Sequence, residues 1–141
     1  SMTALTAARA TDAQVAAVRS LMDSVGRTIL IDEDYFPIFQ ALASCSPAWY
    51  FQIIDTFARA GLKYGLSKDS AVEIAAQAMA GAATLLLAER EAGTIPAQLI
   101  DRVTSPGGTT IAGLLAAEEG GLSNALVGAV DASIHADSHL G

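Results

Sequence analysis

Residues 104–110 carry the side chains best suited to chemistry in this chain of 141 residues. They read Thr-Ser-Pro-Gly-Gly-Thr-Thr and precede residues 111–119, which are predicted to form a helix. Free backbone N–H groups and the positive end of the helix dipole make a helix N-terminus suitable for an anion, and nearby hydroxyls add donors. The same residue types are also common in tight turns that merely cap a helix. From these residues alone, both interpretations stay open.

Few other side chains suggest chemistry. Cys45 is interpreted as a small buried hydrophobe, which is how most free cysteines behave, and not as a catalytic thiol. His135 and His139 are four residues apart, as metal ligands on one helical face can be. A solvated polar face is the simpler interpretation of this pair, and the acidic residues 32–34 are interpreted as a capping and loop cluster. The sequence therefore predicts no metal site.

The first part of the chain, residues 1–31, is predicted to contain a helix at 11–25 and a strand at 27–31. Thr11 and Gln14 form a capping-box pattern at the helix start, and Gly26 is expected to end the helix. The short β-branched run that follows is typical of a strand. One strand is not stable alone, so this part is expected to be the remnant of a larger sheet-containing domain.

Residues 32–141 are predicted to be helical throughout, which makes the fold class all-α, a bundle of long apolar helices. Ser46 and Pro47 are expected to begin a new helix, because a hydroxyl before a proline is the preferred order at a helix start. Gly65 and Ser67 are expected to end that helix and to cap the next one. The predicted helices cover residues 32–44, 47–64, 68–91, 96–103, 111–119 and 122–140.

The composition indicates self-association. Hydrophobic residues make up 52% of the chain and charged residues only 16%, against about 25% charged in an ordinary domain. We expect a large subunit interface, since obligate interfaces resemble a domain core cut in half. The net charge of −7 argues against a nucleic-acid partner. With no stretch of about 18 uninterrupted apolar residues, no signal-peptide pattern and one cysteine, the sequence predicts no membrane partner and a cytoplasmic protein.

The stretch around the glycine-rich loop resembles a known enzyme family. Residues 101–114 read Asp-Arg-Val-Thr-Ser-Pro-Gly-Gly-Thr-Thr-Ile-Ala-Gly-Leu, which is similar to the signature of pyrroline-5-carboxylate reductase. Flanking motifs match in order and spacing: 24–27, 47–48, 76–77, 81–83, 96–99 and 118–122. The similarity extends over residues 2–141.

The resemblance implies the reduction of 1-pyrroline-5-carboxylate to L-proline with NADPH or NADH. The family joins an N-terminal Rossmann domain to a helical domain that interlocks with a second subunit. On this chain, residues 1–31 would be the end of the Rossmann domain and residues 32–141 the dimerisation and substrate-binding domain. The partners would be a second copy, in a homodimer or larger homo-oligomer, and a small imino acid.

The resemblance also implies roles for the loop. Ser105 and Thr110 would donate hydroxyls to the substrate, and the N–H groups of Gly108, Thr109 and Thr110 would bind its carboxylate. Thr110 would lie near the imine nitrogen, as the catalytic residue. Orientation is the expected contribution, because a fixed carboxylate turns the imine carbon toward the nicotinamide.

Two features depart from the family pattern. No Gly-x-Gly-x-x-Gly motif occurs in the chain, so NADP or NAD is expected in a full-length parent, none is expected on this chain, and the chain alone is predicted to be inactive. Residues 43–49 read Ala-Ser-Cys-Ser-Pro-Ala-Trp where the family usually has Ser-Gly-Ser-Gly-Pro-Ala-Tyr. The family places this segment near the cofactor, so Ser46 and Pro47 are candidate neighbours of it. A divergent member with altered substrate or reduced activity is left open.

Two further alternatives remain. The chain could be a stand-alone helical oligomerisation or ligand-binding module without redox activity. It could also be the helical domain of another NADP-linked dehydrogenase or imine reductase, which the length of the loop match disfavours. A glycine-rich strand–turn–helix encoded upstream of residue 2 would favour the reductase, and a natural start at Met2 would favour the module.

Overall fold

The computed structural model describes residues 2–139 of the chain. The chain divides into two compact units. The first contains residues up to Ala48 together with residues from Leu126 onward, and the second contains Trp49–Ala125. Two helices, α3 (Ser46–Lys63) and α7 (Leu122–Asp137), each contribute residues to both units.

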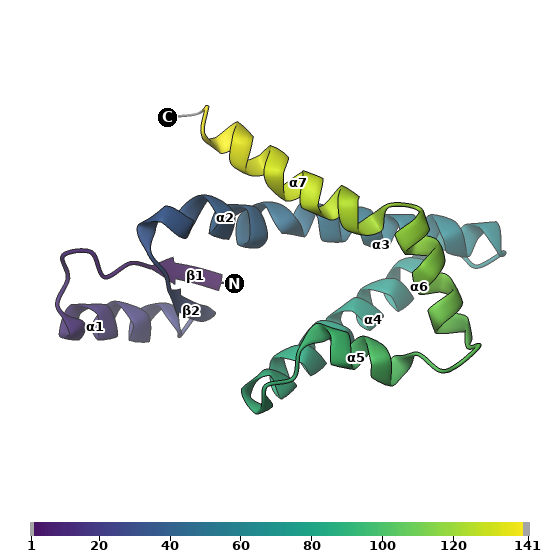
Figure 1. The fold of residues 1–141 in the computed structure, drawn as a ribbon, viewed down its shortest axis with the longest axis horizontal. Helices are drawn as coiled ribbons and strands as arrows, with labels where there is room; N and C mark the ends of the chain where they lie inside the picture. The colour runs from purple at the N-terminus through teal and green to yellow at the C-terminus, as the bar shows by residue number, and fades with distance from the viewer. Residues whose placement is uncertain (1, 140–141) are drawn as a thin grey trace. The chain divides into compact units, whose positions relative to one another are not determined.

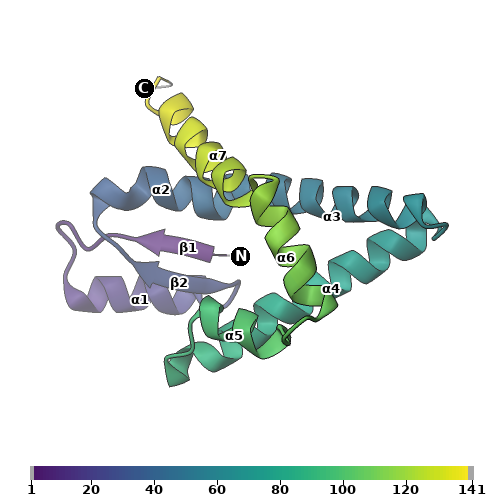
Figure 2. The ribbon, with the colours of Figure 1, turned by 45° about the vertical axis from the view of Figure 1, so that its right-hand side comes forward.

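The first unit contains a two-stranded parallel sheet. Strands β1 (Met2–Leu5) and β2 (Arg27–Leu30) pair along their whole length, and helix α1 (Asp12–Met22) connects them (Figure 2). Parallel strands require such a crossover connection. The strand predicted at 27–31 and the helix predicted at 11–25 are therefore present. Strand β1 was not predicted, because the four residues Met-Thr-Ala-Leu carry too little pattern to indicate a strand.

The capping box at the start of α1 is confirmed. The Gln14 N–H donates to the Thr11 hydroxyl at 3.4 Å, and the Gln14 side-chain oxygen accepts from the Thr11 N–H at 2.9 Å. The predicted end of this helix at Gly26 was wrong. The helix ends at Met22, with Asp23 as its C-cap in a right-handed conformation.

The break predicted before Ser46 was also wrong. A 3-10 turn, η1 (Glu33–Tyr35), leads into α2 (Phe36–Gln40), a π-helical turn, η2 (Ala41–Cys45), and then directly into α3. The Ser46 N–H bonds the Ala41 carbonyl five residues back, and the Ser46 hydroxyl donates to the Leu42 carbonyl at 2.7 Å. Pro47 explains the wide turn, because a proline inside a regular helix removes one hydrogen bond and clashes with the carbonyl four residues before it.

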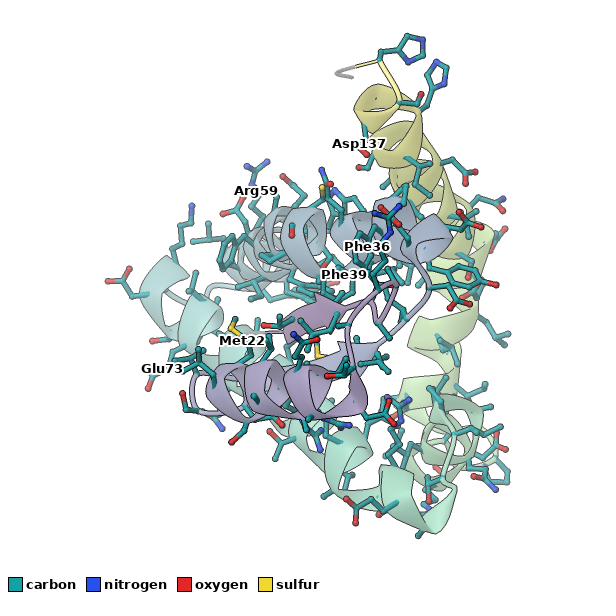
Figure 3. The ribbon with its side chains drawn as sticks, turned by 90° about the vertical axis from the view of Figure 1, so that its left-hand side faces the viewer. Met22, Phe36, Phe39, Arg59, Glu73 and Asp137 are labelled. Carbon is teal, nitrogen blue, oxygen red and sulfur yellow. The ribbon has the colours of Figure 1, made fainter. Side chains whose placement is uncertain are left out.

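Helix α2 places aromatic side chains beside the sheet. Phe36 and Phe39 are half-buried and line a groove together with Ala4 of β1. Gln40 at the end of α2 donates to the Asp137 carboxylate of α7 at 3.1 Å. Figure 3 labels Phe36, Phe39 and Asp137. All of these contacts lie within the first unit. Apolar side chains join α2 to β1, and a hydrogen bond joins α2 to the end of α7.

The second unit begins with a helical hairpin. Helix α3 ends at Lys63, and Gly65 follows it with φ +88°, a left-handed conformation that glycine adopts without strain. Helix α4 (Lys68–Glu89) begins after Ser67, whose hydroxyl accepts the Ser70 N–H at 3.2 Å. The predicted end at Gly65 and the predicted cap at Ser67 are both confirmed.

Small residues allow the two helices of the hairpin to approach closely. Ala58 and Ala71 are buried. A Cβ atom at Gly61 would lie only 2.9 Å from the Cβ of Ala71, a separation that real Cβ atoms do not reach. Glycine at position 61 is therefore required by the packing of α3 against the start of α4.

Charged side chains also join the two helices. Asp55 of α3 lies 2.7 Å from Arg59 on the same helix and 3.1 Å from Lys68 at the start of α4. The hydrogen bond from Lys68 is the largest cause that holds the pKa of Asp55 below its ordinary value, and the Arg59 charge acts in the same direction. Arg59 is labelled in Figure 3.

After α4 the chain turns back through three shorter elements. They are a 3-10 turn, η3 (Arg90–Ala92), helix α5 (Pro96–Val103) and helix α6 (Thr109–Glu119) (Figure 1). Gly93 and Gly121 end η3 and α6 with φ values of +83° and +85°. The all-α prediction for this part of the chain is confirmed, with α5 at its predicted bounds.

Apolar side chains remain exposed in both units. No large side chain among the described residues is fully buried. The segment Lys68–Ala92, which contains α4, is long and apolar enough by length and composition to cross a membrane. The criterion of uninterrupted apolar residues did not select it, because Glu73 and Gln77 break the run. The same composition suits a helix that packs against protein on several sides.

Candidate functional site

The candidate site is the connection between α5 and α6, within the second unit. Helix α5 ends in a backbone-directed cap, because the Thr104 hydroxyl donates to the Ile100 carbonyl at 2.9 Å and the Thr104 N–H donates to the Asp101 carbonyl at 3.4 Å. The direction of the last turn of α5 thus fixes the position of the following residue, Ser105.

Residues 105–108 form a tight turn. The Gly108 N–H donates to the Ser105 carbonyl at 2.9 Å, and Gly107 has φ +69°. Pro106 and a glycine of positive φ occupy the two central positions that a type II turn requires. A Cβ atom at Gly108 would overlap the Ser105 hydroxyl and lie 3.1 Å from the Ser105 carbonyl oxygen. Position 108 therefore has to be glycine for Ser105 to keep its place.

Helix α6 begins directly after this turn. Gly108 is its N-cap in an extended conformation, and no side chain caps it. The first helical N–H with a backbone acceptor is that of Ala112, which donates to the Gly108 carbonyl at 3.3 Å. The N–H groups of Thr109, Thr110 and Ile111 consequently have no acceptor within the helix. They lie at the positive end of the dipole of an 11-residue helix.

The loop brings the predicted substrate residues together. Ser105, Gly108, Thr109 and Thr110 lie around one helix N-terminus, and both threonines belong to its first turn rather than preceding it as expected. Within the described chain, no protein group hydrogen-bonds the hydroxyls of Ser105 and Thr110, and these side chains are exposed. Two free hydroxyls and three free N–H groups can together bind a small carboxylate or another compact anion.

The other predicted neighbours of a cofactor lie in the first unit. Ser46 is only 4% exposed, and its hydroxyl is already bonded to the Leu42 carbonyl. Pro47 is exposed at the start of α3. Ser46 therefore offers no free hydroxyl to a ligand, and a role for this segment stays a prediction.

A polar cluster next to the loop was not predicted. The Glu89 carboxylate at the end of α4 accepts from the Arg102 guanidinium at 2.5 Å and from the Thr94 hydroxyl at 3.2 Å. Glu89 and Arg102 are 13 residues apart and lie on different helices. No helical spacing rule connects such positions, so the pair becomes visible only in the fold.

The remaining candidates form no site of their own. The rings of His135 and His139 are in edge contact with centroids 4.4 Å apart, and His139 Nδ1 lies 2.7 Å from the His135 carbonyl. Cys45 is half-buried in the π-helical turn. In the part of the chain that the structure describes, no three His, Cys, Asp or Glu side chains gather closely enough to hold a metal ion.

Comparison with known proteins matches most of the chain to one family. A family model described as "Pyrroline-5-carboxylate reductase dimerisation" matches residues 33–140. The pyrroline-5-carboxylate reductase of Treponema pallidum (strain Nichols) is 42% identical over 119 residues, which cover 84% of this chain and 44% of that enzyme.

Solved structures agree. A pyrroline-5-carboxylate reductase from Coxiella burnetii matches with a TM-score of 0.85 and 31% identity over 93% of this chain and 48% of that one. The Plasmodium falciparum pyrroline carboxylate reductase, whose crystal structure has NADP bound, matches with a TM-score of 0.81 and 26% identity over 94% of this chain and 52% of that one. The chain thus spans about half the length of these relatives.

Proposed function

Because the chain belongs to the pyrroline-5-carboxylate reductase family, we propose that it supplies the substrate loop and the dimer interface of an enzyme that reduces 1-pyrroline-5-carboxylate to L-proline with NADPH or NADH. The observation that carries this proposal is the uncapped N-terminus of α6, flanked by the free hydroxyls of Ser105 and Thr110. Its backbone N–H groups and hydroxyls can all donate to an anion, which suits the one anionic group of the substrate.

The loop would act by orientation. The N–H groups of Thr109 and Thr110 would hold the substrate carboxylate, and the Ser105 hydroxyl would add a third donor. The Gly108 N–H, which was expected to help them, already donates to the Ser105 carbonyl at 2.9 Å. A ring fixed at its carboxylate presents one face of the imine carbon, and such positioning can supply a large part of a rate enhancement. The Thr110 hydroxyl would lie beside the imine nitrogen, where it could donate a hydrogen bond, alone or through water, as that nitrogen gains its proton.

The hydride donor would be held elsewhere. The β1–α1–β2 unit resembles a nucleotide-binding element in connectivity, but its β1–α1 connection reads Thr-Ala-Ala-Arg-Ala-Thr. It contains no glycine, whereas a dinucleotide-binding turn needs glycines for the backbone to approach the pyrophosphate. The residues present do not fit NADP or NAD, so the cofactor-binding part of a Rossmann domain would have to lie outside residues 2–139. Residues 1–31 would then be the end of that domain.

The apolar surface of the hairpin supports a homodimer. An apolar groove between α3 and α4 is lined by Phe57, Leu66, Ile74 and Met79, and Phe57 and Ile74 are 61% and 60% exposed. Surface of this kind on a charge-poor chain favours a large protein interface. The family model is itself named for dimerisation. We therefore propose a second copy as the partner of α4, with no membrane or nucleic-acid partner, in a cytoplasmic enzyme.

The test joins the Rossmann domain of the Treponema pallidum reductase to this chain, which gives a chimeric protein that we call the fusion enzyme. We expect the fusion enzyme to oxidise NADPH in the presence of 1-pyrroline-5-carboxylate and to form L-proline, and the 141-residue chain alone to do neither. A fusion enzyme that binds NADPH and dimerises but gives no proline would contradict the proposed substrate. In that case L-proline binding to the chain, followed by NMR at the loop amides, separates a stand-alone binding module from a non-binding fold.

A further inference from the structure

The structure contains a polar cluster that the proposed function does not use, formed by Glu89, Thr94 and Arg102. It connects the end of α4 with α5, the helix that leads into the substrate loop. Glu89 accepts from both partners with the same carboxylate oxygen, and the Thr94 N–H donates to the Glu89 carbonyl at 3.4 Å. One side chain therefore joins the end of α4 to both ends of the segment 94–102.

Among the described residues, helix α5 has little other support. It is eight residues long, whereas isolated helices shorter than about 12 residues are marginal in water. Its apolar residues Ile100 and Val103, and Ile95 before it, are exposed, and Leu99 is its one half-buried apolar residue. Local bonds close its ends, because the Ile95 N–H donates to the Gln98 side chain at 3.0 Å and Thr104 caps the last turn. None of these local bonds fixes the direction of the helix relative to α4.

The ion pair supplies that direction. Arg102 lies in the last turn of α5, three residues before Ser105, whose hydroxyl the tight turn holds against Gly108. A rotation of α5 about its axis would carry Ser105 with it. The Glu89 and Arg102 side chains are 30% and 56% exposed, and exposed ion pairs of this kind contribute little to global stability. The pair can therefore control loop position without being required for folding.

We propose that Glu89 and Arg102 are a positioning pair for the substrate loop, in which the ion pair holds α5 so that Ser105 and the N-terminus of α6 face the same carboxylate. This inference rests on the proposed function of the loop. Neither residue is a catalytic residue, since neither belongs to the loop that contacts substrate. Thr94 assists by keeping the Glu89 carboxylate turned toward Arg102.

The first experiment measures loop order in the 141-residue chain and needs no activity. Hydrogen–deuterium exchange of the loop is followed at the Thr104 and Gly108 amides, whose N–H groups donate to the Asp101 and Ser105 carbonyls. It is compared among the wild type, Glu89→Gln, Arg102→Gln and the charge-swapped Glu89→Arg/Arg102→Glu. We expect each single variant to exchange about threefold faster in the loop, the scale set by an exposed ion pair, and the swap to restore most of the protection. Glu91→Gln, which removes an equal charge from the adjacent η3 turn, should leave the loop unchanged.

The second experiment measures kinetics in the fusion enzyme. A positioning role predicts that both single variants raise KM about threefold with little change in kcat, and that the charge swap lowers KM again. Loop exchange that is unaffected by either single substitution would overturn the inference, as would a swap that fails to restore it. An inactive wild-type fusion enzyme would count against the proposed function alone, because the exchange experiment still decides whether the pair orders the loop.

Discussion

Gly108 offers the sharpest test of how the loop works. In Gly108→Ala the new Cβ would overlap the Ser105 hydroxyl, so the hydroxyl has to leave its position. The backbone at position 108 has φ −76° and ψ 166°, a conformation that alanine adopts without strain. The substitution should therefore act on the site and only weakly on the fold. Alanine lowers the conformational entropy of the unfolded chain, which stabilises the folded state by about 0.4–1 kcal/mol. This gain offsets the cost of the tight contact with the Ser105 carbonyl.

The expected effect on binding follows from the lost hydrogen bond. A hydrogen bond to a charged group contributes about 1.5–3 kcal/mol, and each 1.4 kcal/mol is about a factor of ten. We expect Gly108→Ala to raise KM for 1-pyrroline-5-carboxylate in the fusion enzyme by about tenfold or more. Ser105→Ala should do the same, because it removes the same donor.

A double-mutant cycle then tests the mechanism. If Gly108→Ala acts by displacing Ser105, the double variant should be no worse than either single variant, since the hydroxyl can be lost only once. Gly113→Ala is the matched control, because a Cβ there meets nothing within 4 Å and alanine is favoured in a helix interior. Multiplicative effects in the double variant, or an unchanged KM in Gly108→Ala, would refute the reasoning.

Three further predictions follow from the same structure. Thr110→Ala should raise KM in the fusion enzyme about tenfold, with a fall in kcat as well if its hydroxyl serves the imine nitrogen; an unchanged kcat/KM would leave Thr110 as an ordinary first-turn residue. Light scattering should show a dimer at micromolar concentration that Ile74→Asp converts to monomer, while Ser138→Asp, which adds the same charge elsewhere, does not. The lowered folded pKa of Asp55 means that its stabilisation is present above the ordinary carboxyl pKa of about 3.9 and is lost as pH falls through the folded value, so Asp55→Asn should flatten the loss of unfolding free energy below about pH 4; an identical acid profile would contradict this.

Local chemical patterns predicted much of the fold. Four features could be predicted from the sequence, because each depends on residues within one turn of the chain. They are the capping box at Thr11, the helix end at Gly65, the cap at Ser67 and the bounds of α5. The glycine-rich loop was readable for the same reason, since a turn and a helix N-terminus are made of neighbouring residues. That the loop binds an anion stays a prediction, which rests on the free backbone donors of α6 and the hydroxyls beside them.

The errors arose where two local signals competed. Ser46 before Pro47 is a normal helix start, yet α2 and α3 run on through a π-helical turn. A continuous helix can accommodate Pro47 by widening one turn. Tertiary packing, and not the local sequence, decides whether the helix breaks or continues there. Strand β1 was missed because its pairing with β2 joins residues 25 positions apart, as Met2 with Arg27, and four residues show no periodicity that predicts such a partner.

The parts of the proposed site differ in how far apart in the sequence their residues lie. The proposed donors for the substrate carboxylate all come from residues 105–110, so they exist wherever the α5–α6 turn forms. Their direction depends on Glu89, which lies 16 residues before Ser105 in the sequence, and the hydride donor has no fitting turn in this chain at all. Binding, orientation and reduction thus require progressively more of the protein. A chain that binds L-proline through the loop without reducing its imine precursor is therefore the expected behaviour of residues 1–141, and not a sign of a damaged site.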